Sequence, residues 1–152
     1  MTKEMEDKIQ LLRSELKSWI RERDEEIDGL LTALLSRHHI LLIGPRGTAK
    51  SLLIRLLAAS ITDARYWERL FTKHTVPEEV FGAVKLSALK EDKYERAVEG
   101  HLPTAHLAFI DEIWKSNSAI LNSLLTLINE RKYHNDGGAI DCPLETLMGA
   151  SN

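Results

Sequence analysis

The sequence predicts an α/β fold built around a parallel β-sheet. Short apolar runs at 40–43, 107–110 and 147–151 have the length and composition of buried strands. Helical apolar patterns lie between them, and this alternation of strands and helices is typical of parallel sheets with helical crossovers. A chain of 152 residues is long enough for one hydrophobic core, so we expect a single compact unit.

The first predicted elements are two helices. Apolar residues at helical spacing predict an amphipathic helix over residues 3–20. Asp24 is a candidate N-cap for a second helix, because an apolar face follows it. That face consists of Ile27, Leu30, Leu31, Leu34 and Leu35. A strand at 39–43 and a helix at 50–60 come next.

The middle of the chain contains shorter elements. Aromatic and alternating residues predict a second strand over 66–71. Residues 77–82 fit a short helical turn with proline at its first position. Residues 84–98 form two short segments around a charged turn at 90–93, which we interpret as a hairpin-like insertion. The continuous apolar run at 107–110 predicts a buried parallel strand.

The last part of the chain predicts a helix, a hairpin and a strand. Residues 117–130 place one apolar face at helical spacing, made of Ile120, Leu121, Leu124, Leu125 and Ile128. The sequence Asn-Asp-Gly-Gly at 135–138 is a strong turn signal and predicts a β-hairpin over 132–140. A final strand at 147–151 is followed by Asn152.

Composition favours a soluble protein of the cytoplasm. Hydrophobic residues make up 43% and charged residues 28%, as in globular proteins, and a net charge of −3 gives no electrostatic reason to expect nucleic acid or an anionic membrane as partner. The N-terminus is polar, and no apolar run is long enough to span a bilayer. The single Cys142 excludes an internal disulfide framework, and no metal-ligand spacing predicts a zinc site.

Residues 44–51 have the layout of a phosphate-binding P-loop, because a glycine-containing turn follows a predicted strand and opens a predicted helix. Glycines let backbone N–H groups face one anion, and the helix N-terminus adds positive potential. Lys50 can reach the β- and γ-phosphates, and the Ser51 hydroxyl can ligate Mg²⁺. Ala49 stands where the general pattern has a second glycine. The candidate nucleotide-binding residues are Gly44, Pro45, Arg46, Gly47, Thr48, Ala49, Lys50 and Ser51.

Three polar residues follow other predicted strands and complete a candidate catalytic site. Asp111 and Glu112 end the strand at 107–110, and ligands of open α/β sheets bind at the C-terminal ends of strands. Asp111 can hold Mg²⁺ through its water shell, and Glu112 can orient and deprotonate an attacking water. The amide of Asn152 can hold that water or the γ-phosphate.

Simpler interpretations of these residues stay open at this point. The P-loop could be an ordinary strand–turn–helix with a solvent-facing lysine, although its flanks and spacing both disfavour this. Asp111 and Glu112 could be a solvated acidic strand end, and an asparagine after a strand is more often a turn former.

The segments GPRGTAKS, PEEVFG, LAFIDEIWK, ILNSLLTLINERKY and LMGASN together resemble the MoxR branch of the AAA+ ATPases, and most closely its RavA-type (regulatory ATPase variant) members. The resemblance extends from about residue 20 to Asn152, and alanine before the P-loop lysine is typical of this branch. It implies a P-loop NTPase αβα sandwich with Walker A at 44–51. It also implies Walker B at Asp111-Glu112, with Glu112 as catalytic base, and sensor 1 at Asn152.

The resemblance further implies a division into N-terminal helices over 1–36 and a partial AAA+ core over 37–152. Within that core, 84–98 resembles the helix-2 insertion and 132–142 the pre-sensor-1 hairpin. Backbone around 20–23 would lie near the adenine. Arg46 replaces a proline common in the branch and adds a charge at the outer edge of the loop.

In this family a helix with the arginine finger, a fifth strand and a helical lid follow sensor 1. Because the sequence ends at Asn152, we expect a truncated reading frame or fragment with an incomplete sheet and no lid. The edge of strand 39–43 would then be uncovered, and an exposed apolar edge favours aggregation. We interpret Arg131 as capping a helix C-terminus rather than acting across a subunit interface.

The function implied by the resemblance is Mg²⁺-dependent ATP binding and hydrolysis coupled to chaperone-like remodelling of a partner protein. ATP and ADP would be the ligands, Mg²⁺ the cofactor, a homo-oligomeric ring of hexamer size the assembly, and a protein with a von Willebrand factor A domain the partner. The alternative is a nucleotide-binding assembly module without significant hydrolysis of its own. A signalling GTPase is disfavoured because the guanine-reading Asn-Lys-x-Asp motif is absent.

Overall fold

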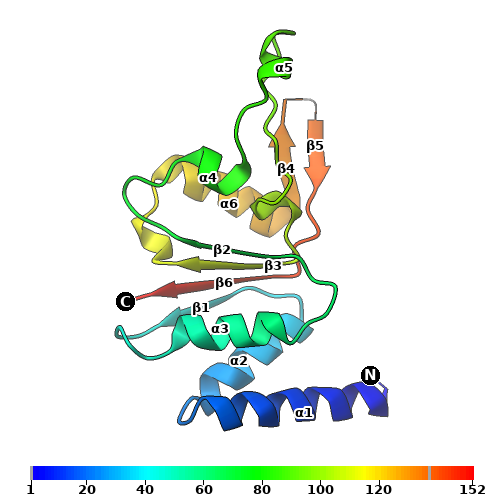
Figure 1. Cartoon of the computed structure of the whole chain (residues 1–152), viewed down its shortest axis with the longest axis vertical. Helices are drawn as coiled ribbons and strands as arrows, with labels where there is room; N and C mark the ends of the chain where they lie inside the picture. The colour runs from blue at the N-terminus through cyan, green and yellow to red at the C-terminus, as the bar shows by residue number, and fades with distance from the viewer. Residues whose placement is uncertain (1, 137) are drawn as a thin grey trace.

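The computed structural model describes residues 2–136 and 138–152; Met1 and Gly137, which belongs to the predicted turn, lie outside the described residues. Four strands form one parallel sheet in the order β1–β6–β3–β2 (Figure 1). Their bounds are Ile40–Ile43 for β1, Tyr66–Leu70 for β2, Leu107–Asp111 for β3 and Thr146–Ser151 for β6. The predicted α/β fold with a parallel sheet is therefore confirmed.

Helices cover both faces of this sheet. Helix α3 lies on one face with α1 and α2 beneath it, and α4 and α6 lie on the other (Figure 1). The α-helices span Lys3–Trp19 (α1), Asp24–Leu35 (α2), Lys50–Ala59 (α3), Pro77–Phe81 (α4), Leu86–Leu89 (α5) and Ser118–Glu130 (α6). Two 3₁₀ turns span Leu102–Thr104 (η1) and Ile113–Lys115 (η2). Within the described part of the chain, no helix is both long and apolar enough to cross a bilayer.

The central strands are apolar throughout because the sheet has a core on each side. Successive side chains of a strand point to opposite faces. Leu107 and Phe109 of β3 accordingly pack into the core shared with α1, α2 and α3. Ala108 and Ile110 pack into the second core, against α4 and α6. This two-sided burial explains why the strand has a continuous apolar run instead of an alternating one.

Strand β1 lies at one edge of the described sheet and hydrogen-bonds to β6 on its other side. The strand is also not fully covered by helices, because Ile43 at its end is 73% exposed. The predicted open edge at 39–43 is thus present among the described strands.

The start of α2 differs from the prediction. Asp24 is the first residue of the helix, and Arg23 occupies the N-cap position without a capping side-chain hydrogen bond. The Asp24 carboxylate lies 3.2 Å from the Lys17 ammonium, at the end of α1. An acidic residue in the first turn also interacts favourably with the helix dipole. Asp24 therefore stabilises the α1–α2 junction through charge and not as an N-cap.

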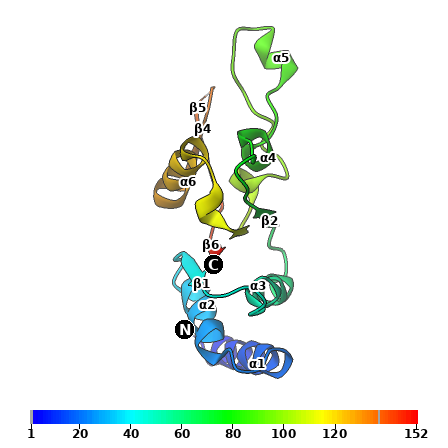
Figure 2. The same ribbon diagram turned by 90° about the vertical axis from the view of Figure 1, so that its left-hand side faces the viewer.

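The insertion at 84–98 and the hairpin at 132–141 lie side by side at the end of the molecule away from α1 (Figures 1 and 2). Strands β4 (Lys132–Asn135) and β5 (Gly138–Asp141) pair antiparallel, as the turn signal predicts. An antiparallel bridge between Val84 and Arg96 joins the two limbs of the insertion. Its first limb carries the helical turn α5 instead of a strand. Backbone N–H of Arg96 donates to Asn135 Oδ1 at 2.8 Å, which ties the two segments together.

Arg131 ends helix α6 in the left-handed conformation, with φ of 55°. Its guanidinium Nη2 donates to the carbonyl oxygens of Arg37, at 2.8 Å, and Glu145, at 3.4 Å. Arg131 thus occupies the C-cap position, as predicted, and joins the end of α6 to the segments that enter β1 and β6.

The His39 side chain completes the hydrogen bonding between β1 and β6. Its Nδ1 accepts from the backbone N–H of Leu147 at 2.9 Å, so the proton of the neutral ring belongs on Nε2, which lies 3.4 Å from the Ile128 carbonyl oxygen. Burial lowers the pKa of His39 below 6.5, and the nearby Arg131 charge lowers that pKa further.

We predict that His39 makes the fold sensitive to mild acid. Because its folded-state pKa lies below the unfolded value, its contribution is fully present above the unfolded pKa and is lost as pH falls through the folded one. The free energy of unfolding, measured by urea titration, should therefore decrease between about pH 7 and pH 5. His39→Gln should flatten this decrease, because glutamine does not titrate. The fold should be kept, since the amide oxygen can still accept from the Leu147 N–H. The exposed His38→Gln is the control, and an equal pH slope in His39→Gln would contradict the prediction.

We also predict unequal effects of alanine at two glycines with positive φ. Gly82 has φ of +97°, and a Cβ there would lie 2.0 Å from the Ala97 carbonyl oxygen. Gly100 has φ of +75° and open space around it. Gly82→Ala should lower the free energy of unfolding by more than about 2 kcal/mol, and Gly100→Ala by about 1 kcal/mol. Urea titration measures both, and equal losses would show that the contact with Ala97 has no effect.

Candidate functional site

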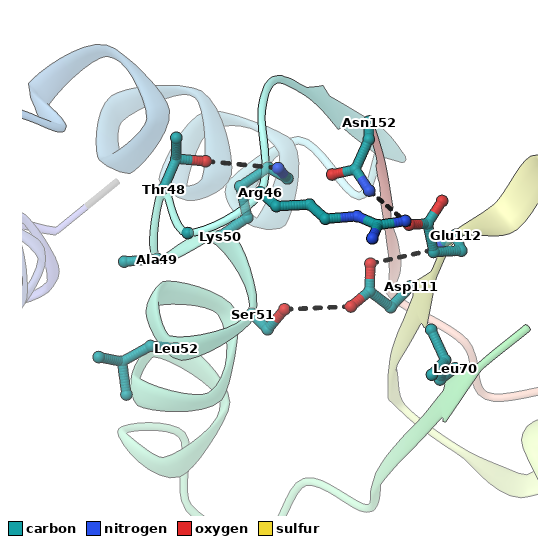
Figure 3. Close-up of a pocket in the computed structure, with 11 residues that line it drawn as sticks. Arg46, Thr48, Ala49, Lys50, Ser51, Leu52, Leu70, Asp111, Glu112 and Asn152 are labelled. Carbon is teal, nitrogen blue, oxygen red and sulfur yellow. Dashed lines mark hydrogen bonds and ion pairs between the residues drawn. The ribbon is translucent and has the colours of Figure 1, made fainter.

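A cavity of about 320 Å³ opens at the C-terminal ends of the strands (Figure 3). It brings together most of the predicted site residues from β1, β3, β6 and the start of α3. Those predicted residues are Arg46, Gly47, Thr48, Ala49, Lys50, Ser51, Asp111, Glu112 and Asn152. Leu52 and Leu70 also line it, although the sequence did not single them out. Gly44 and Pro45 instead line an adjoining cavity of about 370 Å³ beside β1.

The P-loop, residues 44–51, is shaped by two left-handed residues. Its first amide, Gly44 N–H, donates to the Ser151 carbonyl oxygen at 3.2 Å and so extends the β1–β6 pairing. Gly47 then has φ of 77° and Ala49 has φ of 57°, after which α3 begins at Lys50. Ala49 is therefore in a conformation that glycine adopts more easily, which is a physical reason for the usual glycine at this position.

The Lys50 ammonium points into its own loop. It donates to the carbonyl oxygens of Gly44, at 2.7 Å, and Pro45, at 2.9 Å, and lies 3.3 Å from Thr48 Oγ1. A bound phosphate oxygen is a stronger acceptor for an ammonium group than a backbone carbonyl, because the hydrogen bond joins opposite charges. The lysine is thus placed on the concave side of the loop, where a phosphate would contact both the loop and the lysine.

Ser51 and Asp111 meet across the cavity. The Ser51 hydroxyl donates to Asp111 Oδ2 at 3.3 Å, from the first turn of α3 to the end of β3. Mg²⁺ prefers oxygen ligands and usually takes only one or two protein groups beside phosphates and water. This hydroxyl–carboxylate pair has the chemistry of such a donor set. Among the described residues, no group of three acidic, histidine or cysteine side chains could hold a metal.

Glu112 is surrounded by polar groups from three different segments of the chain. Its backbone is left-handed, with φ of 55°, and its side chain is only 12% exposed. Oε1 accepts a hydrogen bond from the Asn152 amide, as Figure 3 shows, and lies 3.4 Å from the Lys115 ammonium. The Arg46 guanidinium lies 3.7 Å from the same oxygen. Lys115 was not predicted, but its spacing of three residues from Glu112 in a helical turn is a usable signal.

The adjoining cavity beside β1 brings Arg23 close to the P-loop. Arg23, Glu25 and Glu26 line it from the start of α2, opposite the loop residues Thr48 and Lys50. The side chain of Ile20, at the other end of the segment expected near the adenine, is buried in the hydrophobic core. The expected position of this backbone near an adenine stays a prediction.

Comparison with known protein families shows which family the chain belongs to. A family model described as the MoxR domain in the MoxR-vWA-beta-propeller ternary systems matches residues 7–152, nearly the whole chain. The chain belongs to this family of MoxR domains. The predicted MoxR branch is therefore confirmed.

Two individual relatives resemble the chain over most of its length. Protein MJ0079 of Methanocaldococcus jannaschii is 47% identical over 150 residues, which cover 98% of this chain and 39% of that protein. Chaperone MoxR1 of Mycobacterium tuberculosis is 26% identical, over 90% of this chain and 35% of its own length. The chain thus spans well under half the length of these relatives.

The structural comparison shows the same fold in a solved protein. The Saccharomyces cerevisiae Hsp104-ADP complex superposes with a TM-score of 0.68 and 14% identity, over 99% of this chain and 29% of that one. At this identity the likeness concerns the fold alone, which is that of the AAA+ ATPases.

Proposed function

We propose that this MoxR domain binds ATP with Mg²⁺ in the cavity at the strand ends and hydrolyses it. The observation that carries the proposal is that three sets of groups line one cavity: the P-loop with Lys50, the Ser51–Asp111 pair, and the Glu112–Asn152 pair. Each set suits one part of the reaction. Family membership supports the proposal, since the chain belongs to a branch of AAA+ ATPases.

The P-loop and Lys50 would hold the phosphates of the nucleotide. The left-handed turns at Gly47 and Ala49 curve the loop so that its amides and the start of α3 face one side. Lys50 would exchange its carbonyl partners for the phosphate oxygens. Ser51 and Asp111 would hold Mg²⁺, which when bound neutralises the charge that develops on the terminal phosphate.

Glu112 would be the general base for the attacking water. Its contacts with Asn152, Lys115 and Arg46 all involve Oε1, which fixes the direction of the carboxylate. A base held in this way can direct its second oxygen at a water in the cavity. Asn152 would keep this orientation and contact the water or the phosphate through its amide.

The proposed wider role follows the family resemblance. We propose that the domain works in a homo-oligomeric ring in the cytoplasm, with residues 84–98 and 132–142 as the helix-2 insertion and pre-sensor-1 hairpin of its AAA+ core, and that it remodels a partner protein. A von Willebrand factor A domain protein is the proposed partner, because the matching family is described from MoxR–vWA–beta-propeller systems. The finer resemblance to the RavA type stays a prediction.

We predict that Lys50 and Glu112 separate binding from turnover. Lys50→Ala should weaken ATP binding more than tenfold, by roughly 1.4 kcal/mol or more, because it removes a charge-assisted contact with the phosphates. Glu112→Gln should not weaken ATP binding, and it should lower phosphate release by about 10²-fold or more. Isothermal titration and a phosphate-release assay measure the two effects, with Lys90→Ala, an exposed lysine on the projecting insertion, as control.

The outcomes distinguish the two candidate functions. Binding in Lys50→Ala equal to that of the parent chain would contradict a nucleotide site at the P-loop. Binding that depends on Lys50, together with phosphate release no faster than in Glu112→Gln, would instead support the nucleotide-binding assembly module without turnover.

We predict further that Ser51 sets the Mg²⁺ requirement. Ser51→Ala removes one of two protein oxygens from the proposed ion site, so the Mg²⁺ concentration for half-maximal ATP binding should rise by about tenfold. Ser60→Ala is the matched control, because its hydroxyl bonds to the Leu56 carbonyl oxygen at 2.8 Å at the far end of the same helix. An unchanged Mg²⁺ requirement in Ser51→Ala would remove this residue from the ion site.

A further inference from the structure

Arg46 extends from the P-loop across the cavity toward Glu112 (Figure 3). Its guanidinium Nη2 lies 3.7 Å from Glu112 Oε1, so an ion pair joins the P-loop to the residue that follows β3. The arginine side chain is 79% exposed, whereas that of Glu112 is 12% exposed. The flexible partner of this pair is therefore the arginine, and the fixed partner is the glutamate.

Glu112 does not depend on Arg46 for its position. The same Oε1 accepts from the amide of Asn152, the residue after β6, and lies 3.4 Å from the Lys115 ammonium on η2. These two groups belong to elements that pack directly beside Glu112. If Arg46 moved away, Oε1 would keep both of these partners.

The Arg46–Glu112 pair is weak enough to exchange. Exposed ion pairs contribute about 0–1 kcal/mol, and a separation of 3.7 Å is longer than a charge-assisted hydrogen bond. A terminal phosphate carries more charge than a carboxylate and presents several oxygens to a guanidinium, which binds phosphate through two parallel hydrogen bonds.

We propose that Arg46 changes partner, from Glu112 to the terminal phosphate of a bound nucleoside triphosphate, and that it thereby selects triphosphate over diphosphate. This inference rests on the proposed function. Glu112 would act on a water beside the γ-phosphate, so an arginine next to Glu112 lies at the γ end of the site. A diphosphate ends one phosphate short of it and leaves Arg46 paired with Glu112. Arg46 thus contacts the nucleotide directly, and it couples phosphate binding to the release of one contact on the proposed base.

The first test compares the affinities of two nucleotides. Isothermal titration of the chain with Mg²⁺ and either AMP-PNP, a triphosphate analogue that is not hydrolysed, or ADP gives the ratio of their dissociation constants. Arg46→Met should weaken AMP-PNP binding by about fivefold and change ADP binding by less than about twofold, since it removes one exposed charge-assisted contact. Arg46→Lys, which keeps the charge, should restore part of the preference. Lys115→Met removes the other cation from Glu112 Oε1 and should leave the ratio near its original value.

A double-mutant cycle tests the exchange itself. Glu112→Gln removes the competing carboxylate charge, so AMP-PNP should bind more tightly when Arg46 is present. The gain should be smaller in the Arg46→Met background, because no guanidinium is released there. Additive effects of the two substitutions would overturn the exchange.

The results separate this inference from the proposed function. A chain that binds AMP-PNP in a Lys50-dependent way but keeps its AMP-PNP to ADP ratio in Arg46→Met overturns the role of Arg46 alone. A chain that binds neither nucleotide overturns the proposed function and the role of Arg46 with it.

Discussion

The parallel register of β1, β6 and β3 is the constraint on which the site depends. Ile43 pairs with Ser151, and Asp111 pairs with Ala150, so the three strands end almost level. The residues that follow them are the P-loop, Asn152 and Glu112. A shift of one residue in either pairing would turn every side chain of a strand to the opposite face and would disrupt the packing of both cores. Core packing on two faces therefore fixes where the polar groups of the cavity meet.

Within this frame the backbone directs the polar side chains. Ala49 and Glu112 are both left-handed residues without the freedom of glycine, and both line the cavity. Such conformations carry an energy of order 1–3 kcal/mol and persist where the surrounding structure determines them. At Ala49 the turn lets α3 start beside the loop, and at Glu112 it brings the carboxylate to Asn152, which follows the neighbouring strand. The two strained positions thus shape the loop and direct the Glu112 carboxylate.

Much of this arrangement could be predicted from the sequence, because it depends on local patterns. Apolar run length located β1, β3 and β6, and the P-loop spacing located the start of α3. Contacts between distant segments could not be predicted this way. Asp24 looks like an N-cap but pairs with Lys17, and His39 accepts from a backbone amide more than one hundred residues away. The first limb of the insertion forms the helical turn α5, Leu86–Leu89, which the sequence analysis did not predict. The division into domains and the roles of the site residues stay predictions.

Arg46 shows how a single residue can add a property to a common loop. A proline at this position would have no charge and no side chain able to cross the cavity, whereas arginine reaches the carboxylate of Glu112. Because Asn152 and Lys115 already hold that carboxylate, the arginine adds little to its orientation. Its distinguishing property is its position beside Glu112, at the end of the cavity where the terminal phosphate is proposed to bind. A cation there would pair with the stronger of the two anions, which would link nucleotide binding at the P-loop to the environment of the proposed base.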